Sequence, residues 1–236
     1  MPHPPLPSVT VVIPVHNESS YLPQALPQLF AEMDSVTADI RVLIAENGST
    51  DNTADLVREA METYSSLSLL ELPTPDYGAA MREGFMQATT QWVANFDIDY
   101  FSGTFLNEAL DLGDSADIVL ASKRVEGADD QRGATRIFAT WTFNQILALV
   151  LSSGVSDTHG MKLVRKTVVD TVAPDVISTT DLFDTELVVR AERAGFRIAE
   201  LPASVVELRD AKSSLVKRVP RTLSGVWKIR RDLRKS

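Results

Sequence analysis

The sequence contains no cysteine and three histidines, His3, His16 and His159, which lie far apart. The lack of cysteine excludes disulfides, iron–sulfur clusters, zinc–thiolate sites and a thiol nucleophile, and histidines at this spacing do not predict a zinc site. We therefore expect any bound metal ion to be a hard cation with oxygen ligands.

Short fingerprints of several common enzyme classes are also missing. No Gly-x-Gly-x-x-Gly follows the first predicted strand, no glycine precedes Lys-Ser or Lys-Thr, and no Gly-x-Ser-x-Gly occurs. These motifs build dinucleotide sites, phosphate-binding loops and nucleophile elbows. Their absence disfavours dinucleotide oxidoreductases, P-loop NTPases and ordinary serine hydrolases.

The charge of the chain is unevenly distributed. Of the 236 residues, 44% are hydrophobic and 23% are charged, which is typical of a folded soluble domain. The net charge of −9 disfavours a nucleic-acid partner. Residues 209–236 contain ten basic and two acidic residues and carry +8, so residues 1–208 carry −17.

Three segments are expected along the chain. Residues 1–7 are proline-rich and lack the charged-then-apolar layout of a secretory signal, so we interpret them as a flexible leader of a cytoplasmic protein. Residues 8–208 form one domain, and residues 209–236 form a basic loop and helix. Residues 137–156 are uncharged; we expect a buried helix or one at a membrane surface there rather than a membrane span.

Short β-branched runs alternate with helical segments in the first half of the chain. Strands are predicted over 9–15, 40–46, 67–72, 91–99 and 117–122, with helices ending near Met33 and spanning about 52–64 and 78–88. This alternation predicts an α/β fold with a mostly parallel sheet flanked by helices. Ligands bind such sheets at the carboxyl ends of the strands.

Polar residues follow the first two of these strands. Asn17 and Glu18 come after the first strand, and Glu46, Asn47 and Asp51 end or follow the second. A carboxylate and an amide at this edge could bind a nucleobase. The same residues also suit a helix cap and an Asn-Gly turn, so taken alone they leave both interpretations open.

Two carboxylates end the predicted strand over 91–99. Alternation along a strand puts Asp97 and Asp99 on one side, where both can bind one divalent cation. A purely structural role is a poor explanation, because adjacent carboxylates repel each other without a cation or donor. Such a cation would neutralise a diphosphate leaving group.

Six motifs occur in an order typical of one enzyme family: VVIPVHNE, AENGSTDNT, YGAAMREG, FDIDY, DTHGMKLVR and FDTELVVRAERAGFRIAELP. On these motifs the chain resembles inverting GT-A glycosyltransferases of the large family 2 type, in the branch of dolichyl- and polyprenyl-phosphate mannosyltransferases and glucosyltransferases. The resemblance covers residues 9–215 and implies a Rossmann-like GT-A fold. It also implies a nucleotide-diphospho-sugar donor, of the GDP-mannose or UDP-glucose type, with Mg²⁺ or Mn²⁺.

The resemblance assigns roles to particular positions. Asp97 and Asp99 would bind the metal ion, and Asp99, Asp184 and Arg209 would take part in catalysis. Donor binding is assigned to Pro14, Asn17, Glu18, Glu46, Asn47, Asp51, Gly78, Asp97, Arg124 and Lys212. The chain departs from the family at Tyr77, where lysine is common, and at Phe101, where close mannosyltransferase relatives have glutamine, so the donor and metal geometry stay open.

The sequence leaves two classes of acceptor open, a sugar hydroxyl and a lipid phosphate. Asp184 matches the position of a general base in relatives that glycosylate sugar hydroxyls, and an aspartate near a helix start also suits a cap. A hydroxyl acceptor needs a base, whereas an anionic lipid phosphate does not. We expect a hexose transferase acting on polyprenyl phosphate; the alternatives are a sugar-hydroxyl acceptor and a non-catalytic nucleotide-sugar-binding module tethered to membranes.

The C-terminal segment 214–235 combines apolar residues with the basic cluster. This composition predicts an amphipathic helix, which could lie on an anionic membrane surface at the cytoplasmic face. The competing interpretation is a helix packed on the acidic body with solvated charges.

Overall fold

The computed structural model describes residues 5–122, 129–130, 151, 154, 158, 160–179, 182–205 and 215–234. The uncharged stretch 137–156 therefore lies almost entirely outside the described residues. None of the described helices is both long enough and apolar enough to cross a membrane.

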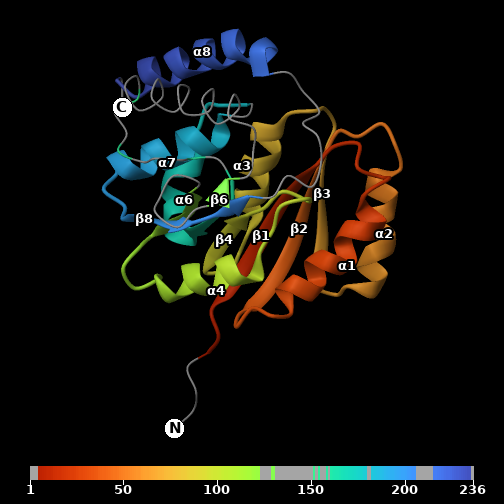
Figure 1. Ribbon diagram of the computed structural model, residues 1–236. Coiled ribbons are helices and arrows are strands. Elements are labelled where there is room, and N and C mark those ends of the chain that lie inside the picture. The colour runs from red at the N-terminus through yellow and green to blue at the C-terminus, as the bar shows by residue number, and fades with distance from the viewer. Residues whose placement is uncertain are drawn as a thin grey trace.

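A seven-stranded sheet forms the centre of the molecule, with the strand order β3-β2-β1-β4-β7-β5-β8 (Figure 1). Its strands are β1 (Ser8–Val15), β2 (Asp39–Asn47), β3 (Leu67–Leu72), β4 (Trp92–Asn95), β5 (Ile118–Ser122), β7 (Lys162–Arg165) and β8 (Ile198–Pro202). All pairs are parallel except those of β7, which runs antiparallel to β4 and β5. A separate two-stranded ladder joins β6 (Asp129–Asp130) to β9 (Ser204–Val205).

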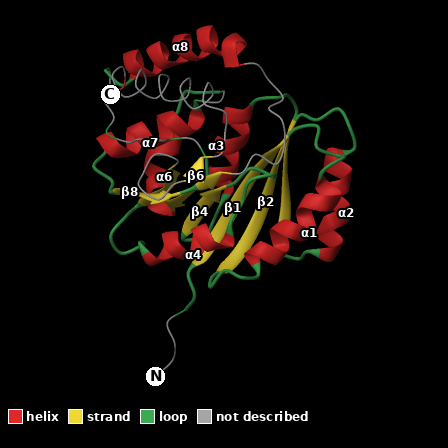
Figure 2. Ribbon diagram, viewed as in Figure 1, coloured by secondary structure: helices red, strands yellow, loops and turns green. Residues whose placement is uncertain are grey.

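Helices cover both faces of this sheet (Figure 2). They are α1 (Leu22–Met33), α2 (Thr53–Thr63), α3 (Tyr77–Gln87), α4 (Gly103–Asp111), α6 (Lys166–Val172), the short 3-10 helix η1 (Ala173–Asp175), α7 (Phe183–Arg193) and α8 (Leu215–Asp232). The mostly parallel α/β architecture with flanking helices is therefore confirmed, as are the three helices expected in the first half.

Strand alternation decides which helices meet which strand residues. Val11 and Ile13 of β1 pack with α1, α2 and α4, whereas Val12 packs on the opposite face with α3, α6 and α7. The period of two in a strand produces these two cores, because successive side chains point to opposite faces. Both faces are apolar, as expected for a parallel sheet covered on two sides.

The strand expected over 91–99 is shorter in the structure. β4 ends at Asn95, and the chain then reverses in a turn in which Asp97 and Tyr100 exchange backbone hydrogen bonds of 3.2 and 3.0 Å. The inference that strand alternation puts Asp97 and Asp99 on one side is therefore wrong. The two carboxylates instead belong to one tight turn beyond the strand, and their role in metal binding stays a prediction.

Candidate functional site

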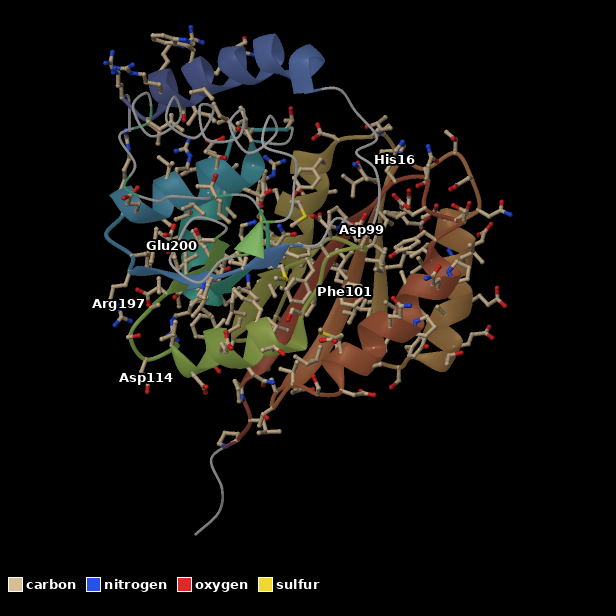
Figure 3. The ribbon with its side chains drawn as sticks, in the orientation of Figure 1. His16, Asp99, Phe101, Asp114, Arg197 and Glu200 are labelled. Atoms are coloured by element: carbon tan, nitrogen blue, oxygen red, sulfur yellow. The ribbon has the colours of Figure 1, made fainter. Side chains whose placement is uncertain are left out.

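The carboxyl ends of β2, β1 and β4 lie next to one another, because these three strands are parallel neighbours. Pro14 lies near the end of β1 opposite Ala45 of β2. The end of β2 and the loops after both strands carry five of the eight polar residues assigned to the donor: Asn17, Glu18, Glu46, Asn47 and Asp51. Figure 3 shows His16, Asp99 and Phe101 in this part of the molecule. The topology therefore brings these separate sequence motifs to one edge.

The loops after β1 and β2 are cross-linked by hydrogen bonds. Asn17 has a left-handed backbone with φ 53°, and its side-chain oxygen accepts a 2.9 Å bond from the Thr50 amide. The Glu18 amide donates to the Thr53 hydroxyl at 2.9 Å. These contacts fix the entrance of the site before any ligand binds.

Asp51 joins the same two loops. The Ser19 hydroxyl donates to it at 2.6 Å and the Thr53 amide at 3.1 Å. Hydrogen bonds from the Ser19 and Thr53 side chains lower the pKa of Asp51 to about 2, from its ordinary value of 3.8. Asp51 is therefore an ionised acceptor that fastens the start of α2 to the loop after β1. The cap position of α2 is Asn52, which makes no side-chain capping bond, so Asp51 holds the first turn from one residue further out.

Glu46 and Asn47 shape the turn at the end of β2. Both are buried; Glu46 accepts a bond from the Ser49 amide, and the Asn47 side-chain oxygen accepts one from the Asp76 amide. Gly48 has φ +63°, and a Cβ there would lie 2.7 Å from the backbone nitrogen of Pro75. Glycine is needed at this position for both its conformation and the close approach.

The turn after β4 presents the two carboxylates assigned to the metal ion. Asp97 is exposed and Asp99 is half-buried. Within the described residues no group of three or more His, Cys, Asp or Glu side chains could hold a metal ion. The pair nevertheless suits Mg²⁺ or Mn²⁺ in donor chemistry, since both ions prefer oxygen and share their coordination with substrate phosphates.

A buried polar network lies beside this turn. Asp184, in the first turn of α7, is 3% exposed. Its Oδ1 accepts bonds from Lys162 Nζ at 2.6 Å and from Asn95 Nδ2 at 3.3 Å, and its Oδ2 accepts one from the Tyr77 hydroxyl at 2.7 Å. Four elements, α3, β4, β7 and α7, thus contribute to one cluster, which we call the Asp184 network.

Opposite charges balance each other within the Asp184 network. Lys162 is fully buried, and its ammonium also donates to the Gly160 carbonyl at 2.9 Å. Burial, and then the negative charges of Asp184 and Asp97, raise the pKa of Tyr77 well above 10. Tyr77 therefore stays protonated and donates to the carboxylate. The Asn95 side-chain oxygen is the one buried side-chain polar atom in the described structure that has no hydrogen-bond partner.

Asp184 does not cap its helix. The cap position of α7 is Leu182, and it makes no side-chain capping bond. Glu186 instead secures the preceding loop, with its oxygens accepting from the Ile177 amide at 3.1 Å and the Ser178 amide at 2.8 Å. The capping interpretation of Asp184 is therefore wrong, because its side chain turns into the interior.

Sequence reasoning missed the three partners of Asp184. Tyr77 was singled out only as a departure from the common lysine, and Lys162 only as part of the motif DTHGMKLVR. The available signal is the position of Lys162 directly before the apolar pair Leu163-Val164 at the start of β7, because a lysine buried there requires a nearby anion. Gly78 is buried in the first turn of α3. Arg124, Arg209 and Lys212 lie outside the described residues.

The similarity to known proteins agrees with the geometry of the site. The family model "Glycosyl transferase family 2" matches residues 10–172, which include both cross-linked loops and the turn with Asp97 and Asp99.

The chain belongs to glycosyl transferase family 2.

Membership of glycosyl transferase family 2 identifies the protein as a nucleotide-sugar glycosyltransferase and confirms the resemblance. An uncharacterized glycosyltransferase of Mycobacterium bovis is 29% identical over 219 residues, covering 88% of this chain and 89% of the relative. A dolichyl-phosphate beta-glucosyltransferase of Trichomonas vaginalis is 25% identical over 242 residues, covering 95% and 69%.

Solved structures share the GT-A fold. Glucosyl-3-phosphoglycerate synthase from Mycobacterium tuberculosis, in complex with Mn²⁺, UDP-glucose and phosphoglyceric acid, is similar with a TM-score of 0.66 and 16% identity, covering 95% of this chain and 79% of that one. A mannosyltransferase from Pyrobaculum calidifontis in complex with GDP-Man and Mn²⁺ gives a TM-score of 0.64 and 20% identity, covering 92% and 61%. At these identities the likeness shows the fold alone.

Proposed function

We infer that this family 2 enzyme transfers a hexose, mannose or glucose, from a nucleotide-diphospho-sugar to an acceptor that is already an anion, namely a polyprenyl phosphate. The observation that carries this proposal is the Asp184 network. It bears on the one residue that the sequence offers as a general base.

A sugar hydroxyl acceptor must lose its proton to a base in the transition state, and that base must lie within hydrogen-bond reach of it. Asp184 is almost fully buried, its charge is balanced by Lys162, and both of its oxygens accept hydrogen bonds. Oδ1 accepts two of these bonds and Oδ2 one, so the remaining acceptor site of Oδ2 lies in the interior, where an acceptor hydroxyl could reach it only by opening the surrounding packing. A phosphate oxygen attacks the anomeric carbon without a base, so this arrangement favours an anionic acceptor and makes Asp184 a positioning residue.

The donor site is proposed at the edge formed by β2, β1 and β4. Asn17, Glu46 and Asp51 hold the loops that would border the nucleoside, and Asp97 and Asp99 would hold Mg²⁺ or Mn²⁺. When bound, such an ion supplies positive charge to the departing diphosphate. Structural neighbours in complex with Mn²⁺ and either UDP-glucose or GDP-Man support this donor class. Arg124, Arg209 and Lys212 are proposed to bind the phosphates, because arginine and lysine supply donors suited to them.

The acceptor class has support from a relative. A protein named as a dolichyl-phosphate beta-glucosyltransferase matches nearly the whole chain. A lipid acceptor resides in a membrane, so the proposal places this enzyme in the cytoplasm, bound peripherally at the cytoplasmic face.

The test combines acceptors with one conservative variant. The parent enzyme is incubated with Mn²⁺, UDP-glucose or GDP-mannose, and either polyprenyl phosphate or free sugars, and products are identified by mass spectrometry. We expect a glycosylated lipid phosphate, and Asp184→Asn should retain turnover within about tenfold, whereas loss of a true base costs about a hundredfold or more. Thermal unfolding checks that Asp184→Asn folds, and Asp184→Asn combined with Lys162→Gln removes the unpaired ammonium.

Transfer to a sugar hydroxyl that disappears with Asp184→Asn would contradict the proposal and favour the hydroxyl acceptor. Asp99→Asn is the matched carboxylate variant, since it replaces the same group at the proposed metal site. It should abolish transfer while leaving the Asp184 network intact.

A further inference from the structure

α8 has two chemically different faces. Val226 and Ile229 are 1% exposed and pack with Leu182 and Val189 of the α7 region. The contact is close, because a Cβ added at Gly225 would lie 2.5 Å from a methyl carbon of Leu182. Over residues 224–232, where the side chains are described, the apolar side of this helix is therefore buried against the protein.

An ion pair and a polar contact strengthen this packing. Arg190 of α7 donates to Asp232 of α8 at 2.6 Å and also binds Glu186 at 2.7 Å. Arg193 donates to the Leu233 carbonyl at 3.1 Å. Through Arg190 and Glu186, α8 is connected to the loop that leads into α7 and Asp184. Figure 1 shows α8 across one end of the molecule, next to α7.

The opposite face of α8 is cationic and carries one large aromatic side chain. Trp227 is 60% exposed, with the Arg230 guanidinium 5.4 Å from its ring centre. Lys228, Arg231 and Arg234 are exposed on the same side. Together with Ser224 and Arg230 these side chains line an open depression of about 650 Å³. We call Trp227, Lys228, Arg231 and Arg234 the docking face.

We propose that the docking face binds an anionic membrane surface, with Trp227 at the level of the lipid headgroups and its three basic residues on lipid phosphates. Tryptophan favours the membrane–water interface because its ring is apolar and its N–H is polar. Basic side chains are attracted to anionic leaflets. The charge of −17 on residues 1–208 is repelled by the same surface, so the molecule orients with α8 toward the lipid.

This mode differs from insertion of an amphipathic helix. The apolar side chains Val226 and Ile229 pack on the protein, so we expect binding to depend on charge and on the exposed Trp227, and to weaken with added salt. Lys228 of the docking face also borders the residues that precede α7. A cavity of about 320 Å³ is lined by Gly225 and Lys228 of α8 together with Leu182 and residues 177–179.

This inference rests on the proposed function only in that a lipid acceptor explains why the enzyme binds a membrane. Lipid binding itself is measured without turnover. The full chain is mixed with vesicles of phosphatidylcholine alone or with added phosphatidylserine, and binding is followed by flotation. We expect binding to the anionic vesicles that weakens with salt. Lys228→Gln, Arg231→Gln and Arg234→Gln together should lower the partition about a hundredfold, or about fivefold for each charge removed.

The matched control removes the same charge elsewhere. Arg41→Gln, Arg58→Gln and Arg197→Gln alter exposed residues outside α8 and should leave binding nearly unchanged. Trp227→Phe should remove the blue shift of tryptophan fluorescence that vesicles induce. Thermal unfolding of each variant confirms that it folds.

Three results would overturn the proposal: equal loss in the control triple variant, equal binding to neutral vesicles, and binding to an RNA oligonucleotide but not to vesicles. Loss of vesicle binding in the docking-face variant with unchanged binding of UDP or GDP and Mn²⁺ would support it. Vesicle binding without sugar transfer to polyprenyl phosphate would contradict the proposed function and leave this inference standing.

Discussion

The two sides of the site satisfy their charged groups in different ways. On the donor side, Asp51 is held by hydroxyl and backbone donors near the surface, and Asp97 is exposed. On the proposed acceptor side, Asp184 and Lys162 form an ion pair with side chains 4% and 0% exposed. The surface groups can exchange a partner for ligand or water, whereas a buried ion that loses its partner is left uncompensated.

This difference suggests that the two sides of the site have different roles. The proposed donor side suits recognition, since Asp97 is exposed and Asp99 is half-buried at the surface. The acceptor side is built for geometry, since its charges are paired within the protein and fix the start of α7. The predictions below test that contrast from the strongest expected effect to the weakest.

Removal of the buried Lys162 ammonium should cause the largest loss of stability. Lys162→Met leaves Asp184 buried without its counter-charge and should lower the free energy of unfolding by about 3–5 kcal/mol. Urea denaturation measures this. The matched control is Lys166→Met, because Lys166 pairs with Asp170 at the same 2.6 Å but Asp170 is 62% exposed. That exposed pair contributes about 0.5 kcal/mol or less. Similar losses in the two variants would erase the contrast.

Loss of the Tyr77 hydroxyl should have a smaller effect on stability. Tyr77→Phe keeps the ring but leaves one oxygen of Asp184 without its donor, which costs about 1–3 kcal/mol. The control is Tyr64→Phe, which keeps the stacking of that ring on Phe30 and should stay within about 0.5 kcal/mol of the parent. An unchanged unfolding free energy for Tyr77→Phe would show that the Asp184 network tolerates a missing donor.

Change at the donor side should affect binding rather than stability. Asp99→Asn should reduce the Mn²⁺-dependent gain in UDP or GDP affinity at least about tenfold, equivalent to about 1.4 kcal/mol, with little change in unfolding. Isothermal titration calorimetry with and without Mn²⁺ measures this gain. Asp114→Asn is the control, since Figure 3 shows Asp114 at a distance from Asp99. A gain that survives in Asp99→Asn would refute the metal assignment.

The weakest effect should be a dependence of stability on acid pH. The pKa of Asp51 is about 2 in the folded protein against an ordinary 3.8, so its ionised form stabilises the fold above pH 3.8. That contribution is lost as the pH falls from 3.8 through about 2. Asp51→Asn should flatten this part of the curve of unfolding midpoint against pH.

Asp117 provides the comparison for Asp51. Hydrogen bonding to Arg197 lowers the pKa of Asp117 to about 2 as well, but here the donor is a charged guanidinium. Added salt should therefore weaken the acid dependence due to Asp117 and spare that due to Asp51, whose donors are neutral. Equal sensitivity to salt would show that Asp51 is held by charge instead.

Much of the fold could be predicted from local patterns, and part of the site could not. Periodicity located the helices near Met33, 52–64 and 78–88, and the polar strand ends pointed to the ligand edge. Periodicity gave a wrong prediction after Asn95, where a turn closed by backbone hydrogen bonds replaces the expected strand. The pattern FDID satisfies alternation without being extended, so residue types alone did not reveal the turn.

The amino-acid sequence by itself determined the layered α/β architecture, because periods of two and of about 3.6 are local properties of the chain. It also determined family membership and the closely spaced carboxylates Asp97 and Asp99, but not the turn in which they lie. Only the tertiary structure decided the surroundings of Asp184, whose partners Tyr77 and Asn95 lie 107 and 89 residues away along the chain. Such pairings depend on how helices pack on the sheet, and helix packing likewise buries Val226 and Ile229 of α8 while the docking face stays in solvent.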